Sequence, residues 1–394
     1  MFSQRTAWNL TPNALTRALE AHRRAGGELL DLTASNPTQA GLQYDQPAIL
    51  EALADPAALV YHPEPGGWLH AREAVAQYYG ELAAVSAAGE APPAADSILL
   101  TVSTSEAYSF VFRLLCNPGD AVLAPAPSYP LFEFLAGLQD VQLAPYALFY
   151  DRGWSIDFDS LEQALTPRTR AIILVHPNNP TGSYISGREA ERLNHLCRRH
   201  DLALVVDEVF LDCSLDGPHF SFAWNREALT FTLSGVSKIS GLPQMKLAWI
   251  AASGPEALLR PALGRLEIIA DTYLSLNAPV QHAAPVLLAQ RHAIRGQLDR
   301  RIRANLAELD RQLAAQSLCS RLEVEGGWYV VLRTSAARPD EELAVALLQQ
   351  RSVLVQPGYF YDFGEDGYIV LSLITPEPQF AEGVRRLLEF VGGS

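Results

Sequence analysis

Between residues 98 and 251 the chain alternates short apolar runs with segments that have helical periodicity, such as 106–115 and 186–200. The runs contain many aliphatic and β-branched residues and no regular polar alternation, which is typical of strands buried on both faces of a sheet. Because strands and helices alternate, we expect a mainly parallel α/β sheet. The runs are 98–102, 121–125, 171–175, 202–206, 229–233 and 247–251.

After residue 285 the sequence pattern changes. A long charged segment with helical character, about residues 286–315, precedes two apolar runs and a further helical segment at 341–350. This order of elements predicts a smaller α+β domain. We therefore expect three parts, which are an N-terminal segment packing on the small domain, a large domain and the small domain. Their ranges are residues 1–45, 46–285 and 286–394.

The composition excludes several classes of protein. The 394-residue chain has a net charge of −14 and a pI near 5.1, which disfavours binding to nucleic acid or to an anionic membrane. No apolar run approaches the roughly 20 residues that span a bilayer, and the first ten residues lack the apolar stretch of a secretion signal. We therefore expect a cytoplasmic protein. None of the four cysteines has CxxC spacing, so no metal site is expected.

Polar side chains follow the predicted strands at the points where the strands end. In open α/β sheets, ligands bind beyond the carboxyl ends of the strands. Each residue alone has an ordinary explanation, since hydroxyls cap helices, PNNPTG can form a turn, and a lone lysine is most often solvated. Together they bring hydroxyl, aromatic, amide, carboxylate and amine groups to one edge. The residues are Ser103, Thr104, Ser105, Tyr129, Asn179, Asp207, Ser237 and Lys238.

This set of groups suits the chemistry of pyridoxal 5'-phosphate. The amine of Lys238 would form a Schiff base with the cofactor aldehyde, and the carboxylate of Asp207 would keep the ring nitrogen protonated. An aromatic side chain stacks on a pyridine ring, and hydroxyl and N–H groups at a helix N-terminus bind phosphate. The small neighbours of Lys238 in SGVSK allow a cofactor to approach, and partial desolvation makes a lysine amine more nucleophilic.

Six short motifs also occur in the order and approximate spacing of one known family. On these motifs the chain resembles the class I/II aminotransferases, which are fold-type I pyridoxal-phosphate enzymes. The resemblance covers nearly the whole chain. It implies a large domain with a mainly parallel, seven-stranded type of sheet between helices, and a smaller α+β domain. The motifs are YHPEPGG (61–67), STSEA (103–107), PSYP (127–130), NNPTG (178–182), DEVF (207–210) and SGVSK (234–238).

The resemblance implies a role for each matching residue around the cofactor. Lys238 would carry the cofactor, Asp207 would pair with the ring nitrogen, and Asn179 would reach the ring oxygen. Tyr129 would stack on the ring. The residues implied in phosphate binding are Ser103, Thr104, Ser105, Ser237 and Lys246.

Two further residues matter for assembly and substrate. Tyr61 resembles the tyrosine that reaches the phosphate of the partner subunit, which implies a homodimer with shared active sites. Asn36, in ASNPT, lies where the N-terminal loop of the family covers the substrate.

Three positions depart from the family pattern. Phe210 stands where a tyrosine is usual, so a hydrogen bond to the ring oxygen would be lost. Lys246 replaces an arginine and would hold phosphate as a point charge without bidentate geometry. Val370 stands where the family has the arginine that binds the substrate α-carboxylate. A buried carboxylate without a partner is costly, so it is held elsewhere or the substrate is not an ordinary α-amino acid.

Three arginines, Arg5, Arg72 and Arg333, are candidates to hold that carboxylate, and the sequence does not choose among them. The aromatic segment PGYFYDFG (357–364) either lines the pocket or packs the small domain, and both alternatives stay open. His176, which precedes PNNPTG, is interpreted as a hydrogen-bonded structural histidine rather than a site residue.

The sequence therefore predicts a pyridoxal-phosphate-dependent aminotransferase that moves an amino group from an amino acid or amine to a 2-oxo acid. Lys238 would shuttle the proton between Cα and C4'. Phe210 and Val370 keep open an alternative, a lyase, cyclase, racemase or oxidase with the same cofactor acting on an amino-acid derivative. A non-catalytic binding protein is disfavoured because the lysine is retained, and a dinucleotide-binding oxidoreductase because no GxGxxG follows a strand.

Overall fold

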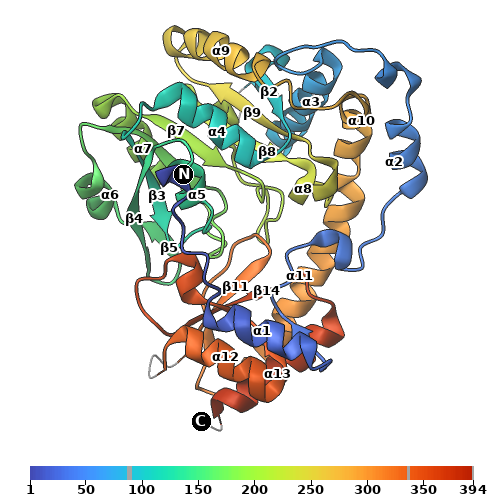
Figure 1. Cartoon of the computed structure of the whole chain (residues 1–394), viewed down its shortest axis with the longest axis vertical. Coiled ribbons are helices and arrows are strands. Elements are labelled where there is room, and N and C mark those ends of the chain that lie inside the picture. Colours follow the sequence, from blue (N-terminus) through green and yellow to red (C-terminus); the bar gives the residue numbers. More distant parts are fainter. Residues whose placement is uncertain (87–90, 335–337, 393–394) are drawn as a thin grey trace.

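A computed structural model describes residues 1–86, 91–334 and 338–392 of the chain. Figure 1 shows a large part built around a twisted sheet with helices on both faces, and a smaller part below it. The α/β fold predicted from the sequence is confirmed. The strands of the main sheet are β2 (Ile98–Thr101), β3 (Ala121–Ala126), β4 (Gln142–Tyr150), β5 (Trp154–Ile156), β6 (Thr169–Val175), β7 (Ala203–Asp207), β8 (Thr230–Gly235) and β9 (Ala248–Ser253).

The helices cover the sheet and build most of the smaller part. The α-helices are α1 (Ala14–Arg24), α2 (Gln46–Leu53), α3 (Leu69–Ser86), α4 (Thr104–Leu115), α5 (Phe132–Gly137), α6 (Phe158–Ala164), α7 (Gly187–His200), α8 (Val236–Ile239), α9 (Glu256–Asp271), α10 (Ala278–Ala289), α11 (Arg291–Leu313), α12 (Asp340–Arg351) and α13 (Glu377–Gly392). The 3-10 helices are η1 (Gln4–Thr6), η2 (Pro37–Gln39), η3 (Pro56–Leu59), η4 (Ala95–Ser97), η5 (Phe222–Trp224), η6 (Pro243–Met245) and η7 (Gly358–Tyr361). Within the described ranges, no helix is long and apolar enough to cross a membrane.

The main sheet has the strand order β2-β9-β8-β7-β6-β3-β4-β5. Pairing is parallel from β8 through β7, β6 and β3 to β4, and β9 is antiparallel to both β8 and β2. Seven strands therefore run from β2 to β4, as expected, and the three-residue strand β5 pairs antiparallel with β4 as an eighth. The carboxyl ends of β3, β6, β7 and β8 consequently meet at one edge of the sheet.

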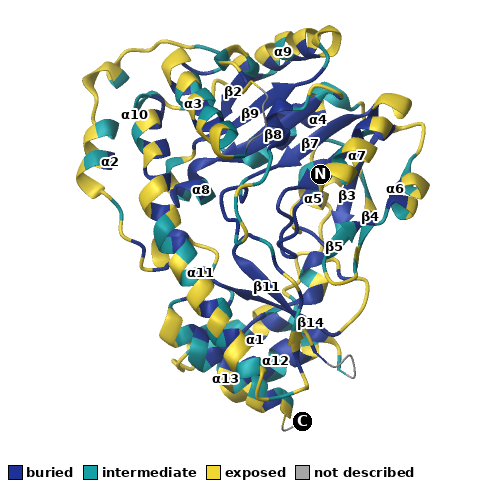
Figure 2. Cartoon of the chain, turned by 180° about the vertical axis from the view of Figure 1, so that it is seen from behind, coloured by how far each residue is buried: buried dark blue, intermediate teal, exposed yellow. Residues whose placement is uncertain are grey.

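The continuous apolar runs are explained by packing on both faces of the sheet. Along β6, Ile173 and Val175 belong to the cluster beneath α4 and α9, whereas Ile172 and Leu174 belong to the cluster beneath α6 and α7. Successive side chains of a strand point to opposite faces, so both sets must be apolar. Figure 2 shows the result, with the strands buried and the outer sides of the helices exposed.

Two features of the fold differ from the prediction. Strands β4 and β5 form a hairpin at the edge of the sheet, and β4 contains Pro145 and is only partly buried. Proline is confined to strand edges and irregular positions, and it weakens a strand signal. The charged helical segment expected at 286–315 is also different, because it spans the end of α10 and the separate helix α11.

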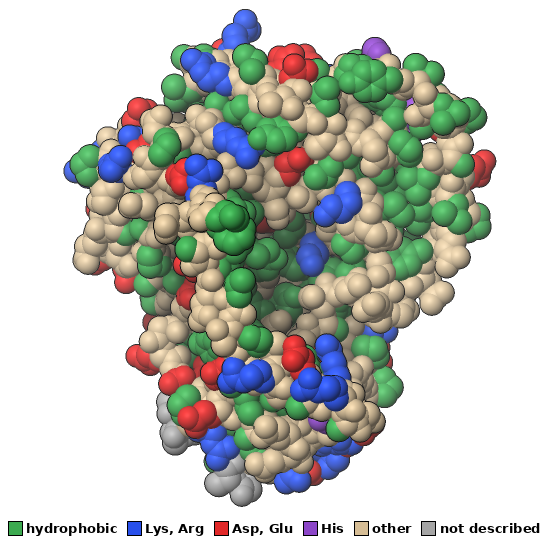
Figure 3. All heavy atoms as spheres, in the orientation of Figure 1, with side chains coloured by type: hydrophobic (Ala, Val, Ile, Leu, Met, Phe, Trp, Pro, Cys, Tyr) green, Lys and Arg blue, Asp and Glu red, His purple; other side chains and the backbone are tan. Residues whose placement is uncertain are grey.

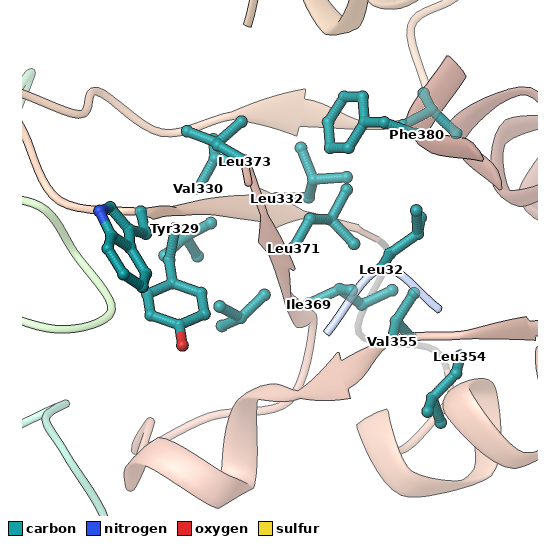
Figure 4. Close-up of a cluster of buried hydrophobic side chains, with 14 of the residues drawn as sticks. Leu32, Tyr329, Val330, Leu332, Leu354, Val355, Ile369, Leu371, Leu373 and Phe380 are labelled. Carbon is teal, nitrogen blue, oxygen red and sulfur yellow. The ribbon is translucent and has the colours of Figure 1, made fainter. Parts of the chain in front are cut away.

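The smaller part is built on the sheet β10 (Ser320–Arg321), β11 (Tyr329–Arg333), β14 (Tyr368–Ser372) and β13 (Gln356–Pro357). One face packs against apolar side chains from other elements. Val330, Leu332, Ile369 and Leu371 lie on this face together with Leu32, as Figure 4 shows. The opposite face carries the alternate residues of the same strands.

The N-terminal segment lies against the smaller part. Helix α1 packs against α12, and the short strand β1 (Leu30–Asp31) pairs in parallel with β12 (Val353–Leu354). Figure 1 shows α1 beside α12 and α13, far in sequence from both. The division into residues 1–45, 46–285 and 286–394 stays a prediction, and its second boundary falls within α10.

Candidate active site

A cavity of about 380 Å³ lies at the carboxyl edge of the main sheet, and residues of the smaller part complete its wall. This volume is in the range of small-molecule sites. Figure 3 shows the molecule hollowed between its large and small parts, with hydrophobic side chains inside the hollow. Eight residues predicted from the sequence line this one cavity. They are Ser103, Thr104, Ser105, Tyr129, Asn179, Asp207, Ser237 and Lys238.

Lys238 lies on the four-residue helix α8, directly after β8. Its Nζ lies 4.8 Å from the ring centroid of Trp328 and 5.5 Å from that of Phe210. Burial lowers the pKa of the Lys238 amine, and the nearby Cys213 and Asp207 partly offset this effect. A desolvated amine that deprotonates more readily is a better nucleophile and base.

Asp207 ends β7 and is buried. Its Oδ1 accepts a hydrogen bond from the backbone N–H of Val209 at 3.1 Å, and its Oδ2 accepts one from the hydroxyl of Tyr108 at 3.2 Å. Burial raises the pKa of Asp207 to about 6, against the opposing effects of Val209, Tyr108 and Lys238. The hydrogen-bond donors Val209 and Tyr108 are neutral, and the Lys238 amine does not hydrogen-bond to the carboxylate. The Asp207 carboxylate is therefore suited to bind a cationic N–H group of a ligand.

Tyr108 was not predicted as a site residue. It lies on α4, is buried, and packs edge-on against Phe132 with ring centroids 5.4 Å apart. It follows Thr104 by four residues, so it lies on the same side of the helix one turn further on. That spacing was the signal available in the sequence.

We expect Tyr108→Phe to weaken cofactor binding by about threefold to tenfold, because a buried carboxylate loses one donor at a cost of ~1 kcal/mol. Equilibrium dialysis of the cofactor would measure the change. Tyr146→Phe is the matched control, since the buried Tyr146 donates instead to the backbone oxygen of Ile173 at 2.9 Å. Equal losses in both variants would show that Tyr108 acts only through packing.

The two adjacent asparagines of the PNNPTG turn differ in their partners. Asn178 donates to Pro127 O at 3.1 Å and to Thr181 Oγ1 at 2.9 Å, and accepts from Ser128 Oγ at 3.0 Å. Asn179 lines the cavity, and its buried Oδ1 has no hydrogen-bond partner among the described residues. Buried polar atoms are normally paired, so Asn178 holds the turn while Asn179 has capacity left for a ligand.

Gly182 fixes this turn against the segment that precedes β11. Its φ of +72° favours glycine, and a Cβ at this position would lie 2.4 Å from the backbone oxygen of Gly326. The N–H of Gly326 donates to the oxygen of Gly182 at 2.9 Å. The turn that carries Asn179 is thus tied to the smaller part of the molecule.

Hydroxyl groups gather at the N-terminus of α4. Ser103 is the N-cap, and its side chain accepts from the N–H of Glu106 at 3.2 Å. Thr104 and Ser105 form the start of the 12-residue helix and line the cavity. The free N–H groups and dipole of a helix N-terminus favour an anion.

Three predicted residues lie outside the cavity lining. Lys246 is exposed, with φ of +54°, just after η6. Asn36 caps η2, where its Oδ1 accepts from the N–H of Thr38 at 3.0 Å, and the neighbouring Ser35 lines the cavity instead. Tyr61 is 81% exposed.

The three candidate arginines have other partners. Arg5 forms an ion pair with Asp140 at 2.6 Å. Arg72 donates to the backbone oxygens of Gly67 at 2.8 Å and Ala95 at 2.9 Å. The guanidinium of Arg333 lies 5.7 Å from the ring centroids of both Tyr150 and Tyr368. None of the three arginines belongs to the cavity lining.

The wall from the smaller part contains residues that were not predicted. Tyr329, Gln356 and Tyr361 line the cavity. The segment 357–364 therefore both lines the pocket and packs the smaller part. Tyr361 lines the cavity, whereas Phe363 stacks on Tyr368 with ring centroids 4.5 Å apart. The sequence showed its aromatic content but not which ring faces the site.

His176 is a buried structural residue, as interpreted from the sequence. Its Nε2 lies 3.0 Å from the oxygen of Phe220, and its Nδ1 accepts from the N–H of Ile185 at 3.0 Å. The tautomer with the proton on Nε2 satisfies both contacts. Burial lowers the pKa of His176 to about 3, with a hydrogen bond to Phe220 acting in the opposite direction.

This shift predicts a pH dependence of stability. The unfolded chain protonates His176 near its ordinary pKa of 6.5, whereas the folded chain does so only near 3, so stability falls as the pH drops below 6.5. By pH 5 this group should cost about 2 kcal/mol. Urea unfolding of wild type and His176→Gln between pH 7.5 and 5 would measure it. The variant should be less stable throughout but lose less on acidification, and parallel curves would contradict the assignment.

Comparison with known proteins identifies the family. The profile described as "Aminotransferase class I and II" matches residues 27–387, so the chain belongs to this family. The glutamate-pyruvate aminotransferase AlaA of Haemophilus influenzae is 24% identical over 378 residues, which cover 93% of this chain and 91% of the relative. The aspartate/prephenate aminotransferase of Thermus thermophilus is 28% identical over 383 residues, covering 95% and 94%. The alanine aminotransferase from Pyrococcus furiosus superposes with a TM-score of 0.87 at 21% identity, covering 100% of both chains.

The chain is thus a pyridoxal-phosphate-dependent aminotransferase, as the sequence predicted. The cavity fits this cofactor on its own evidence. Asn179 offers an unpartnered polar atom, Asp207 offers a buried carboxylate with neutral partners, and the hydroxyls of Thr104 and Ser105 lie at a helix N-terminus. These groups match a ring hydroxyl, a ring N–H and a phosphate.

Proposed function

We propose that Lys238 is the residue that binds pyridoxal 5'-phosphate covalently and moves the proton during amino transfer. The observation that carries this proposal is the convergence of eight chemically matched side chains on one cavity, with a partly buried lysine among them. In this arrangement Asp207 would hold the ring nitrogen, Asn179 the ring oxygen, and Tyr129 one face of the ring. The cofactor supplies the electron sink when bound.

The remaining roles follow from the chemistry of each group. Ser103, Thr104, Ser105 and Ser237 would bind the phosphate at the start of α4 and α8. Lys246 is exposed, so its proposed contribution is long-range charge, which salt would screen. Lys238, freed by the incoming amine, would accept the proton from the amino-bearing carbon of the substrate at Nζ. Its lowered pKa leaves a larger neutral fraction to do so.

The relatives support amino acids and 2-oxo acids as the substrate classes. Their names specify glutamate with pyruvate, aspartate or prephenate, and alanine. The choice among these donors depends on the part of the cavity that faces the substrate. Val370 is buried in the core of the smaller part and is not among the residues that line the cavity.

A homodimer is proposed from the surface around Tyr61. The neighbouring Leu59 and Val60 are 90% and 66% exposed, and this run lines a concave surface together with Phe110 and Leu274. Contiguous exposed apolar side chains favour a protein interface. Sedimentation of wild type and Val60→Asp would test it, since the charge should shift a dimer toward monomer. A cytoplasmic location and the loop role of Asn36 stay predictions.

The covalent assignment has a direct test, because Lys238 and Lys246 are the two lysines of the whole chain. Borohydride reduction of the cofactor-loaded protein should fix the cofactor to the peptide that contains Lys238. A reduced adduct on Lys246, or none in saturated protein, would refute the proposal. Mixing the loaded enzyme with an amino donor should then give the amine form of the cofactor and a keto product.

A further inference from the structure

The side of the cavity formed by the smaller part carries no charge. Tyr329 on β11, Gln356 on β13 and Tyr361 in η7 line it, and Ser35 of the N-terminal segment adds a hydroxyl. We call these four residues the neutral wall. The hydroxyl of Tyr361 donates to Oε1 of Gln356. Among the described residues, the Gln356 side chain makes no other hydrogen bond, so its amide N–H groups remain for a ligand.

Strand register explains why the neutral wall faces the cavity. Gln356 lies directly opposite Val370 across the antiparallel pair β13/β14, and Val331 lies opposite Val370 on the other side. Directly opposed residues share a face, and residues two apart along a strand do too. Tyr329, Gln356 and Val370 therefore lie on one face of the sheet, opposite the face that carries Val330 and Leu332. Val370 is fully buried behind the wall.

The charged side chains that line the cavity already have roles toward the cofactor in the proposed function. Of the described residues that line it, Lys238 is the one cation and Asp207 the one carboxylate. The proposed function uses both toward the cofactor. Arg5, Arg72 and Arg333 are engaged outside the cavity. A substrate carboxylate against the neutral wall would be desolvated without a cationic partner, which is costly.

We propose that Gln356 and Tyr361 bind a neutral hydrogen-bonding group on the amino-bearing carbon of the substrate. The preferred donors are then amino amides or amino alcohols rather than α-amino acids with a free carboxylate. The Gln356 amide donates to the carbonyl or hydroxyl oxygen, and the hydroxyl of Tyr361 orients that amide. This inference rests on the proposed function of the cavity.

Unreactive ligand pairs test the preference by binding alone. Each pair consists of a carboxylic acid and its primary amide, without an amino group, and the pairs carry methyl, benzyl or carboxyethyl side groups. Calorimetry would measure the binding of each compound to the cofactor-loaded enzyme. For the best side group, the amide should bind at least about tenfold more tightly than the acid. Equal or tighter binding of the acid, or no measurable binding of any amide, would overturn the proposal.

Variants assign the preference to the two residues. Gln356→Arg puts a cation on the partly exposed β13 and should reverse the preference toward the acid by about tenfold or more. Tyr361→Phe should weaken amide binding severalfold and leave the acid unchanged. Tyr359→Phe is the matched control, because the Tyr359 hydroxyl donates to Glu341 at 3.0 Å and lies outside the cavity lining. If Gln356→Arg keeps its melting temperature and still prefers the amide to the same degree, the preference does not depend on Gln356.

The borohydride test separates the two levels of inference. If the adduct maps to Lys238 but acids bind as tightly as amides, the neutral-wall proposal fails while the proposed function stands. If no adduct forms on Lys238, the proposed function itself fails, whatever the ligand preference.

Discussion

Lys238→Ala should abolish turnover, with a loss of about 10⁴-fold or more, because in the proposed function the variant lacks both the covalent attachment and the base at Nζ. The long-wavelength absorption of the lysine-bound cofactor should disappear as well. The substitution removes an amine that lies near the rings of Phe210 and Trp328, and it adds no buried charge. The fold should therefore survive, so the loss can be read as chemistry.

The matched control is Lys246→Ala, which removes the second lysine of the chain from an exposed position. After borohydride reduction this variant should still carry the cofactor on Lys238. Measured together, absorbance, peptide mapping and circular dichroism separate loss of attachment from loss of folding. Lys238→Ala protein that keeps its cofactor absorption and its activity would contradict the assignment.

The sequence was most informative where one physical rule determines both the residue pattern of a strand and the position of its end in the sheet. The run 171–175 is apolar at every residue because β6 is covered on both faces, and the two clusters divide its side chains alternately. The strand ends then bring Asp207 and Lys238 to one edge without further information. The position of eight residues along one cavity could be predicted because parallel strands share a direction.

The contacts that the sequence did not reveal depend on packing between distant elements. The bond from Tyr108 to Asp207 requires α4 to lie across the end of β7, 99 residues away in sequence. The neutral wall depends on the register that sets Gln356 opposite Val370, and register follows from the whole smaller sheet. The β4 strand was missed because its edge position allows a proline and a half-exposed pattern.

Asp207→Ala should weaken cofactor binding and lower the rate by about 10² to 10³-fold, the usual effect of removing a preorganised electrostatic partner. The Asp207 carboxylate is buried, and Lys238 is the one cation that lines the described cavity with it. Its negative charge is therefore available to a protonated ring nitrogen. Asp207→Asn, which keeps the shape and removes the charge, should show most of the same loss.

The pKa of Asp207 adds a second measurement with a defined sign. Burial raises this pKa to about 6 in the protein without ligand, so acidification through pH 6 neutralises the carboxylate and removes its attraction for the ring N–H. Cofactor affinity, measured by dialysis from pH 8 to 5, should therefore fall toward low pH in the wild type. Asp207→Asn cannot titrate, so subtracting its profile removes the contributions of the phosphate and of the cofactor ring. If the two profiles have the same slope around pH 6, the Asp207 charge does not hold the cofactor, and the electron-sink role must rest on another group.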